Sequence, residues 1–154
     1  MSGETVLVTG ATRGIGREIV RLLLRLGHDV IGVYRRDRDS ADALLREHPE
    51  RLRLLQTELG DADALEVLAE TIAQDHGVLA AAVLCAGTTA HGELAADDGS
   101  RVLAAQLHEN LFAPLALVGV LVRAEALIGP AAVVIVGSNL ARRGLAGRAA
   151  YSAA

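Results

Sequence analysis

The sequence of 154 residues contains no lysine, and all 15 of its basic residues are arginines. This absence excludes mechanisms that depend on a lysine amine: the phosphate-binding lysine of a P-loop, a Schiff base and the attachment of pyridoxal phosphate. The single cysteine, Cys85, excludes an internal disulfide and is typical of a reducing compartment. There are two tyrosines, one phenylalanine and no tryptophan, so aliphatic side chains must fill the core.

Other features are also missing. The formal net charge is −4, and no more than two arginines stand together, which gives no basic surface for nucleic acid. The five histidines lack the spacing of paired ligands, so no metal site is expected. We find no apolar run long enough for a membrane span and no basic segment leading into an apolar signal core. We therefore expect a cytoplasmic protein that binds neither nucleic acid nor membranes.

Strand and helix patterns alternate along the chain, which predicts one α/β domain over residues 1–154 with a parallel, doubly wound sheet. The expected strands are residues 6–9, 29–34, 52–56, 79–85 and 131–137. The expected helices are one between Gly16 and Gly27, one over 40–48, one between Asp61 and Gly77, and one over 100–127. A polar loop is expected from residue 138 to Tyr151.

The stretch Thr9-Gly10-Ala11-Thr12-Arg13-Gly14-Ile15-Gly16 joins the first expected strand to the first helix. At the start of a helix the backbone N–H groups are free and the helix dipole is positive, so an anion such as a pyrophosphate is the natural ligand. Glycines let the ligand approach the backbone closely. The spacing alone also fits a tight turn without any ligand.

The Thr-Gly-x3-Gly-x-Gly spacing resembles the cofactor loop of the short-chain dehydrogenase/reductase family. Ala86-Gly87, Asn110, Ser138 and Tyr151 follow in the order and at the spacing of that family's motifs. The resemblance implies a Rossmann-like sheet of five strands in the order 3-2-1-4-5, without the family's C-terminal part. It also implies that Tyr151 is the acid/base, that Ser138 orients a carbonyl, and that Asn110 holds a relay water through its main-chain carbonyl.

Pro114 bears on the expected role of Asn110. It lies four residues later and has no N–H to return to the Asn110 carbonyl, which would leave that oxygen free for a water. A simple kink of the helix is the other interpretation of this proline.

Two arginines favour NADP(H) as the cofactor. Arg35 stands where an NAD-preferring site has a carboxylate, and Arg13 lies in the glycine loop opposite. Two guanidinium groups suit a 2′-phosphate, although they could also be solvated surface residues, and the nearby Asp37 leaves NAD(H) possible. The predicted cofactor-binding residues are Gly10, Thr12, Arg13, Gly14, Ile15, Gly16, Arg35, Glu58, Leu59, Cys85, Ala86 and Gly87.

The chain departs from the family pattern at three points. Glu58-Leu59 stand where the family has an Asp-Val pair against adenine, and Leu84-Cys85 replace two asparagines. Tyr151 to Ala154 match only the first four positions of the Tyr-x-x-x-Lys motif. We therefore expect the domain to be C-terminally incomplete: part of a longer enzyme, a truncation, or a short relative.

The resemblance implies an NADP-dependent ketoreductase, most like the 3-oxoacyl-carrier-protein reductases. Its substrate would be a small or carrier-protein-bound ketone such as a 3-oxoacyl thioester, and the protein would be a homo-oligomer, a dimer or tetramer. Because the motif lysine is absent, a catalytically silent dinucleotide-binding or dimerisation module remains open. A Rossmann-like methyltransferase is disfavoured by the serine–tyrosine pair.

Overall fold

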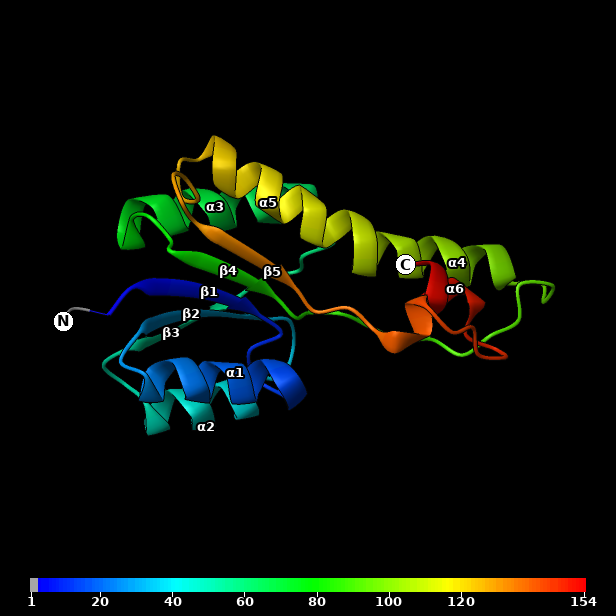
Figure 1. Ribbon diagram of the computed structural model, residues 1–154, viewed down its shortest axis with the longest axis horizontal. Coiled ribbons are helices and arrows are strands. Elements are labelled where there is room, and N and C mark those ends of the chain that lie inside the picture. The colour runs from blue at the N-terminus through cyan, green and yellow to red at the C-terminus, as the bar shows by residue number, and fades with distance from the viewer. Residues whose placement is uncertain (1–2) are drawn as a thin grey trace.

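The computed structural model describes residues 3–154 of the chain. Its five strands form one parallel sheet in the order β3-β2-β1-β4-β5, which confirms the predicted arrangement (Figure 1). The strands are β1 (Thr5–Thr9), β2 (Asp29–Tyr34), β3 (Leu52–Gln56), β4 (Ala81–Leu84) and β5 (Ala132–Ile135). All pairings are parallel, so the carboxyl ends of the strands meet at one edge of the sheet.

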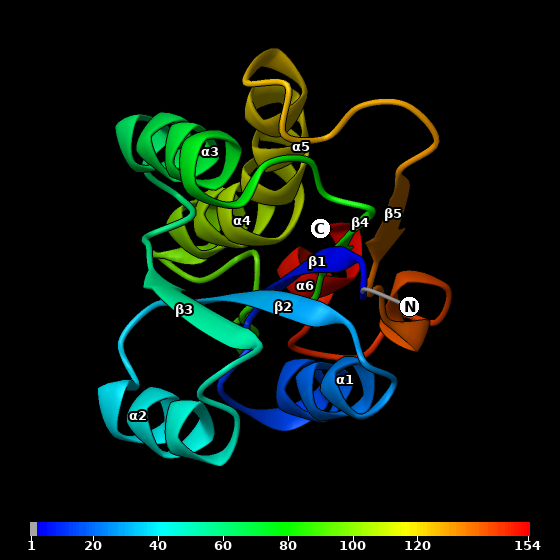
Figure 2. The ribbon, with the colours of Figure 1, turned by 90° about the vertical axis from the view of Figure 1, so that its left-hand side faces the viewer.

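Helices cover both faces of the sheet. The first three are α1 (Gly14–Arg25), α2 (Arg38–Glu47) and α3 (Ala62–His76), and α4 (Gly99–Leu107) and α5 (Ala113–Arg123) follow. Figure 2 shows α1 and α2 below the sheet and α3 and α5 above it. The predicted doubly wound architecture is therefore observed.

Alternating strand residues supply two separate cores. Leu7 and Ile31 pack with residues of α3 and α5 on one face, while Val6, Val8 and Val30 pack with residues of α1 and α2 on the other. Successive side chains of a strand point to opposite faces, so a strand covered on both sides reads as a continuous apolar run. This is why the short runs in the sequence predicted buried strands.

Carboxylates set the beginnings of two helices. The Asp37 side chain accepts a hydrogen bond from the Ser40 N–H, so α2 begins at residue 38 rather than at 40 as predicted. The Asp61 side chain accepts from the N–H groups of Asp63 and Ala64, and α3 ends at His76, directly before the predicted cap residue Gly77. Such caps satisfy N–H groups that have no partner within the helix.

The helix predicted over residues 100–127 is interrupted. A π-helical turn, η1 (His108–Phe112), separates α4 from α5, and regular helix ends at Arg123. In the π-turn the Ala113 N–H donates to the carbonyl of His108, five residues back. Pro114 then falls in the first turn of α5, where a proline is tolerated, and the wider turn relieves the clash of its ring with the carbonyl four residues back.

Together these segments form one 25-residue helix, Gly99–Arg123, that by length and composition alone could cross a membrane. The sequence-based expectation concerned only uninterrupted apolar runs, and here polar residues interrupt the apolar run without ending the helix. One third of the most apolar 18-residue stretch of this helix is buried, and α5 packs against α3. A buried helix of a globular domain meets the same criterion.

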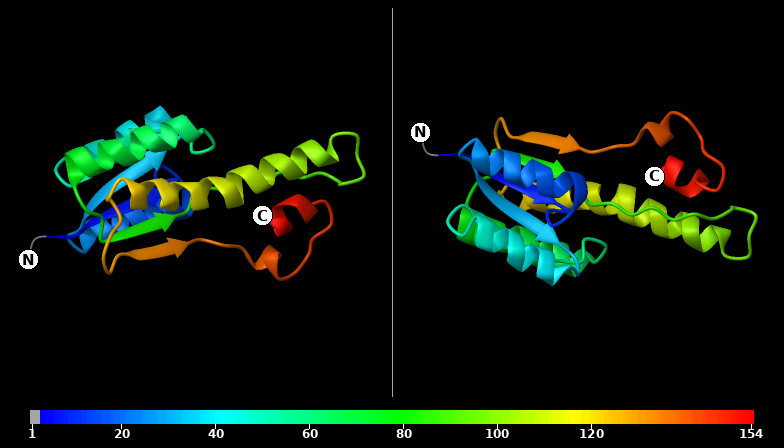
Figure 3. Two further views of the ribbon diagram at one scale, coloured as in Figure 1. Left: turned by 90° about the horizontal axis from the view of Figure 1, so that it is seen from above. Right: turned by 90° about the horizontal axis from the view of Figure 1, so that it is seen from below.

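The last segment contains more structure than the predicted loop. It holds a short 3-10 helix, η2 (Asn139–Ala141), and α6 (Ala149–Ala153), which packs against both α4 and η2. Figure 3 shows this segment folded back toward α4, beyond the carboxyl end of β5. All four residues of the edge strand β5 are exposed.

Candidate functional site

The turn after β1 lies against the end of β4. Gly10 has φ +68°, and a β-carbon at this position would come within 3.1 Å of the Ala86 Cα. Gly10 and Ala86, both predicted as cofactor-binding residues, are thus neighbours at the carboxyl edge of the sheet. Ligands bind at this edge in doubly wound folds.

Two further glycines shape the start of α1. A β-carbon on Gly16 would overlap the carbonyl oxygen of Gly10, so only glycine lets α1 approach the turn this closely. Gly14 has φ +52°, and nothing lies within 4 Å of the place where its β-carbon would stand. The turn is therefore tightly packed at Gly10 and Gly16 and open at Gly14.

The amino end of α1 is the part of the turn best suited to an anion. Its cap residue, Arg13, makes no side-chain hydrogen bond to the helix, and the first turn contains no acidic residue, in contrast to α2 and α3. Free N–H groups and the positive end of the dipole therefore face the open side of the turn. These residues fit a pyrophosphate, and neither a side-chain cap nor an acidic residue of the first turn competes with it. Thr12 is buried and Ile15 is 63% exposed beside this end.

Thr9 joins β1 to β4. Its hydroxyl oxygen accepts hydrogen bonds from the N–H groups of Cys85 and Ala86, both at 3.0 Å. These N–H groups lie where the strand pairing ends, so the hydroxyl fixes the Cys85-Ala86-Gly87 segment against the glycine turn. Neither the motif nor the hydrophobic pattern pointed to this role of Thr9.

Cys85 is half-buried at the same place. Burial raises the pKa of its thiol above the ordinary value of 9.0, and the Gly16 N–H directed at the sulfur partly opposes this shift. The thiol is therefore protonated at neutral pH and acts here as a small packing residue.

The predicted 2′-phosphate position is bordered by charges of both signs. Hydrogen bonds from Ser40 lower the pKa of the Asp37 carboxyl, and the charge of Arg13 adds a smaller lowering. Arg35, at the end of β2, has its Nη1 3.7 Å from Glu58 Oε1 and also 3.7 Å from Glu109 Oε1. The structure thus brings the predicted Arg35 and Glu58 together and adds Glu109, which was not predicted.

The loop after β3 is held by the π-turn. His108 Nε2 lies 2.8 Å from the carbonyl oxygen of Gly60, and since a carbonyl only accepts, this nitrogen carries the proton. Leu59 packs against the edge of the core, and the preceding residue, Glu58, forms its ion pair with Arg35. The side chain of His108 is exposed, and its contact with a loop 48 residues away in the sequence leaves no signal in the sequence.

Asn110 is fixed by its side chain. Its Oδ1 accepts from the Thr88 N–H and its Nδ2 donates to the Thr88 carbonyl, both at 2.9 Å. A β-carbon on Gly87 would stand 3.2 Å from the same Oδ1. The amide therefore ties the π-turn to the loop after β4, while the predicted use of the main-chain carbonyl stays a prediction.

Ser138 and Tyr151 lie on adjoining elements beyond β5. Ser138 caps η2, and its Oγ accepts from the Leu140 N–H at 3.2 Å, which leaves the hydroxyl proton free to donate elsewhere. Tyr151 lies in α6, which packs against η2 and against α4 just before Asn110. The fold brings the elements of the three predicted catalytic residues to the carboxyl side of the sheet.

Two contacts hold the loop before α6 in place. Arg148 Nη1 donates to Thr89 Oγ1 at 2.7 Å, and the Gly92 N–H donates to the Gly147 carbonyl at 3.0 Å. The loop that precedes Tyr151 is thus attached to the loop that follows β4. Arg148 was absent from the predicted site because a lone arginine in a loop carries no sequence signal.

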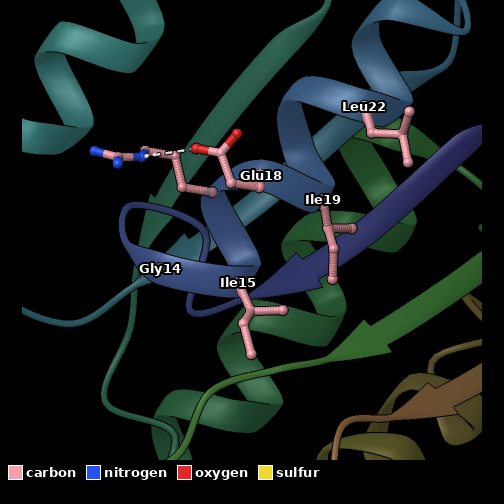
Figure 4. A pocket seen from close by; sticks show the side chains of 6 residues that line it. Gly14, Ile15, Glu18, Ile19 and Leu22 are labelled. Carbon is pink, nitrogen blue, oxygen red and sulfur yellow. Dashed lines mark ion pairs between the residues drawn. The ribbon is translucent and has the colours of Figure 1, made fainter.

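An apolar groove runs along α1 away from the turn. Ile15, Ile19 and Leu22 line it and lie in a row on one side of the helix (Figure 4). Among residues 3–154, no group of three histidine, cysteine or acidic side chains is placed to hold a metal ion.

Comparison with known proteins gives a consistent result. The family model for short chain dehydrogenase matches residues 4–154. A 3-oxoacyl-(acyl-carrier-protein) reductase of Aggregatibacter actinomycetemcomitans is 33% identical over 68% of this chain and 46% of its own length. A cyclic-di-GMP-binding biofilm dispersal mediator protein of Escherichia coli is 31% identical over 99% of this chain and 61% of its own length.

Solved structures show the same likeness. A short chain dehydrogenase from Burkholderia cenocepacia in complex with NADP has a TM-score of 0.85 and 28% identity, covering 99% of this chain and 62% of that one. The chain thus spans about half to two thirds of the length of these three proteins.

Proposed function

The chain belongs to the short-chain dehydrogenase/reductase family, and from this premise we propose that it binds a nicotinamide dinucleotide and serves an oxidoreductase that acts on a carbonyl or alcohol. One observation carries the proposal: the amino end of α1, without a side-chain cap, opens onto the glycine turn at the carboxyl edge of the sheet. The N–H groups of Gly14 and Ile15 would hold the pyrophosphate, since the Gly16 N–H is directed at the Cys85 sulfur. Ala86 and Gly87 would border the adenine side.

We propose NADP(H) as the preferred form. Arg13 and Arg35 border the place where the adenosine ribose would lie, and forked guanidinium groups suit a phosphate. Asp37 is the first carboxylate after the end of β2. Its side chain already accepts the hydrogen bond from Ser40 at the start of α2. It is therefore less available to a ribose hydroxyl than a free carboxylate would be.

The chemistry follows from hydroxyl groups of this chain. The bound nicotinamide would supply or accept a hydride. The Tyr151 hydroxyl would give a proton to the reduced carbonyl oxygen, and Ser138 would donate a hydrogen bond to the same oxygen with the proton that its contact with Leu140 leaves free. Asn110 would support the proton path beside them. A ketone such as a 3-oxoacyl thioester is the substrate class that we propose, as the name of one relative suggests.

A second candidate is a dinucleotide-binding module without catalysis. None of the 154 residues is a lysine, so the family's activating lysine is not among them. A relative matched over 99% of this chain is named for nucleotide binding rather than for an enzymatic reaction. This candidate shares the glycine turn with the first and differs only in the use of Ser138 and Tyr151.

Two assays on the purified chain separate these candidates. Titration with NADPH tests binding, and the loss of NADPH absorbance with a 3-oxoacyl thioester tests reduction. Binding together with turnover that Tyr151→Phe abolishes supports the oxidoreductase. Binding without turnover supports the silent module, and absence of binding overturns both.

A further inference from the structure

Arg35 is shared between two carboxylates from different parts of the chain. Its Nη1 lies 3.7 Å from an oxygen of Glu58, which follows β3, and 3.7 Å from an oxygen of Glu109, in the π-turn. The three side chains are each between 33% and 48% exposed, so a ligand can reach them. This corner of the site therefore holds one positive and two negative charges, and Glu109 is the carboxylate that was not predicted there from the sequence.

Glu109 is held in its position by a chain of hydrogen bonds. Gln106 is 3% exposed, and its Oε1 accepts from the Ala90 N–H at 3.1 Å, which directs its Nε2 toward Thr88. That Nε2 donates to Thr88 Oγ1 at 3.0 Å. The Thr88 hydroxyl therefore points its own proton at Glu109 Oε2, 2.6 Å away.

In this series of hydrogen bonds each donor has one acceptor, and the last acceptor is the carboxylate of Glu109. The bond from Thr88 occupies Oε2 of Glu109, and Oε1 is the oxygen that faces Arg35. Glu109 is thus fixed from the buried side and presents a charge to Arg35 from the exposed side. Glu58, by contrast, has the ion pair with Arg35 but no side-chain hydrogen bond to anchor it among residues 3–154.

We propose that Glu109 weakens the preference of this chain for a 2′-phosphorylated cofactor: its carboxylate, anchored by Thr88, competes with a 2′-phosphate for Arg35. This inference rests on the proposed dinucleotide function. A 2′-phosphate must draw Arg35 away from Glu109 and then lie near that carboxylate, whereas an unphosphorylated ribose meets no such repulsion. Glu109 therefore moderates a preference that Arg13 and Arg35 create, and it does so next to Asn110.

The test compares 2′,5′-ADP with 5′-AMP, because the two probes differ only in the 2′-phosphate. Calorimetric titrations use the 154-residue chain and its Glu109→Gln variant, in which the amide oxygen can still accept from Thr88 while the charge is lost. Glu70→Gln, on the exposed surface of α3, is the matched control for net charge. Arg35→Gln and the double variant show whether the effect passes through Arg35.

We expect Glu109→Gln to bind 2′,5′-ADP about threefold to tenfold more tightly at low salt, with 5′-AMP changed less than about twofold. The gain should shrink with added salt and disappear in the Arg35→Gln background. Unchanged or weaker binding of 2′,5′-ADP, or an equal gain for both probes, overturns the inference while the proposed function stands. If the parent chain binds neither probe, the proposed function fails and the inference with it.

Discussion

Asn110 and Thr88 are joined by two hydrogen bonds, one in each direction between the amide of Asn110 and the backbone of Thr88. The residue that the motif marked as catalytic therefore also attaches the π-turn to the loop after β4. Since the neighbouring Glu109 contacts both Thr88 and Arg35, this attachment lies between the cofactor end and the substrate end of the proposed site.

Replacement of Asn110 should reduce stability as well as any activity. Asn110→Ala leaves the N–H and the carbonyl of Thr88 without their partner, and we expect a loss of about 1–3 kcal/mol in the free energy of unfolding. Urea denaturation followed by circular dichroism measures it. Asn139→Ala, an exposed residue of η2, is the control, with an expected change below about 0.5 kcal/mol. Equal stability of the two variants would show that the Asn110 bonds contribute nothing.

The Thr9 hydroxyl can be tested in the same way. Thr9→Val keeps the shape of the side chain but removes the acceptor of two N–H groups, and Thr9→Ser retains that acceptor. We expect Thr9→Val to lower the free energy of unfolding by about 1–3 kcal/mol and to weaken nucleotide binding, with Thr9→Ser closer to the parent. Parent-like behaviour of Thr9→Val in both measurements would contradict the assigned role.

Gly16 should tolerate no side chain. Gly16→Ala places a β-carbon onto the Gly10 carbonyl and forces α1 away from the turn, which costs about 1–3 kcal/mol and abolishes nucleotide binding. Gly137→Ala is the matched control, because nothing lies within 4 Å of its added β-carbon. Thermal unfolding and NADPH titration measure the two effects, and full binding by Gly16→Ala would disprove the close approach.

The Cys85 thiol should react slowly. Because burial raises its pKa, the thiolate fraction at any pH below that value is smaller than for an ordinary thiol. Alkylation by iodoacetamide should be slower than that of glutathione at pH 8, and its rate should keep rising above pH 9. Mass spectrometry over a pH series follows the reaction. Rapid labelling at pH 7 would mean that Cys85 is a reactive thiol.

Local sequence patterns predicted most of the fold. Val6 to Val8 and Val30 to Val33 predicted buried strands, and Asp61 and Gly77 marked both ends of α3, because such signals lie within a few residues. The π-turn was missed because it involves Pro114 together with the bonds between Asn110 and Thr88, two residues that lie 22 positions apart in the sequence. The 3-10 helix η2 and the short α6 were missed because neither has a full amphipathic period.

The candidate site, like the fold, could be predicted only where the sequence signal is local. Glycine positions such as Gly10 and Gly16 could be predicted, since their backbone requirement is local and recurs at fixed spacing. Glu109 could not, because its role arises from hydrogen bonds that run from Gln106 through Thr88 and from an ion pair with Arg35, which lies 74 positions before Glu109. Arg35, after the end of β2, was the expected specificity signal, and in the structure Glu109 contacts it from the π-turn.

Titration of the purified chain with NADPH and, separately, with NADH tests the central claim most directly. We expect saturable binding of both, tighter for NADPH, with the preference reduced in Arg35→Asp and kept in Arg36→Asp, whose side chain is exposed beside it. Equal affinities in the parent chain would contradict the assignment of Arg13 and Arg35 to a 2′-phosphate. Absence of saturable binding for either dinucleotide would contradict the assignment of the glycine turn as a cofactor site.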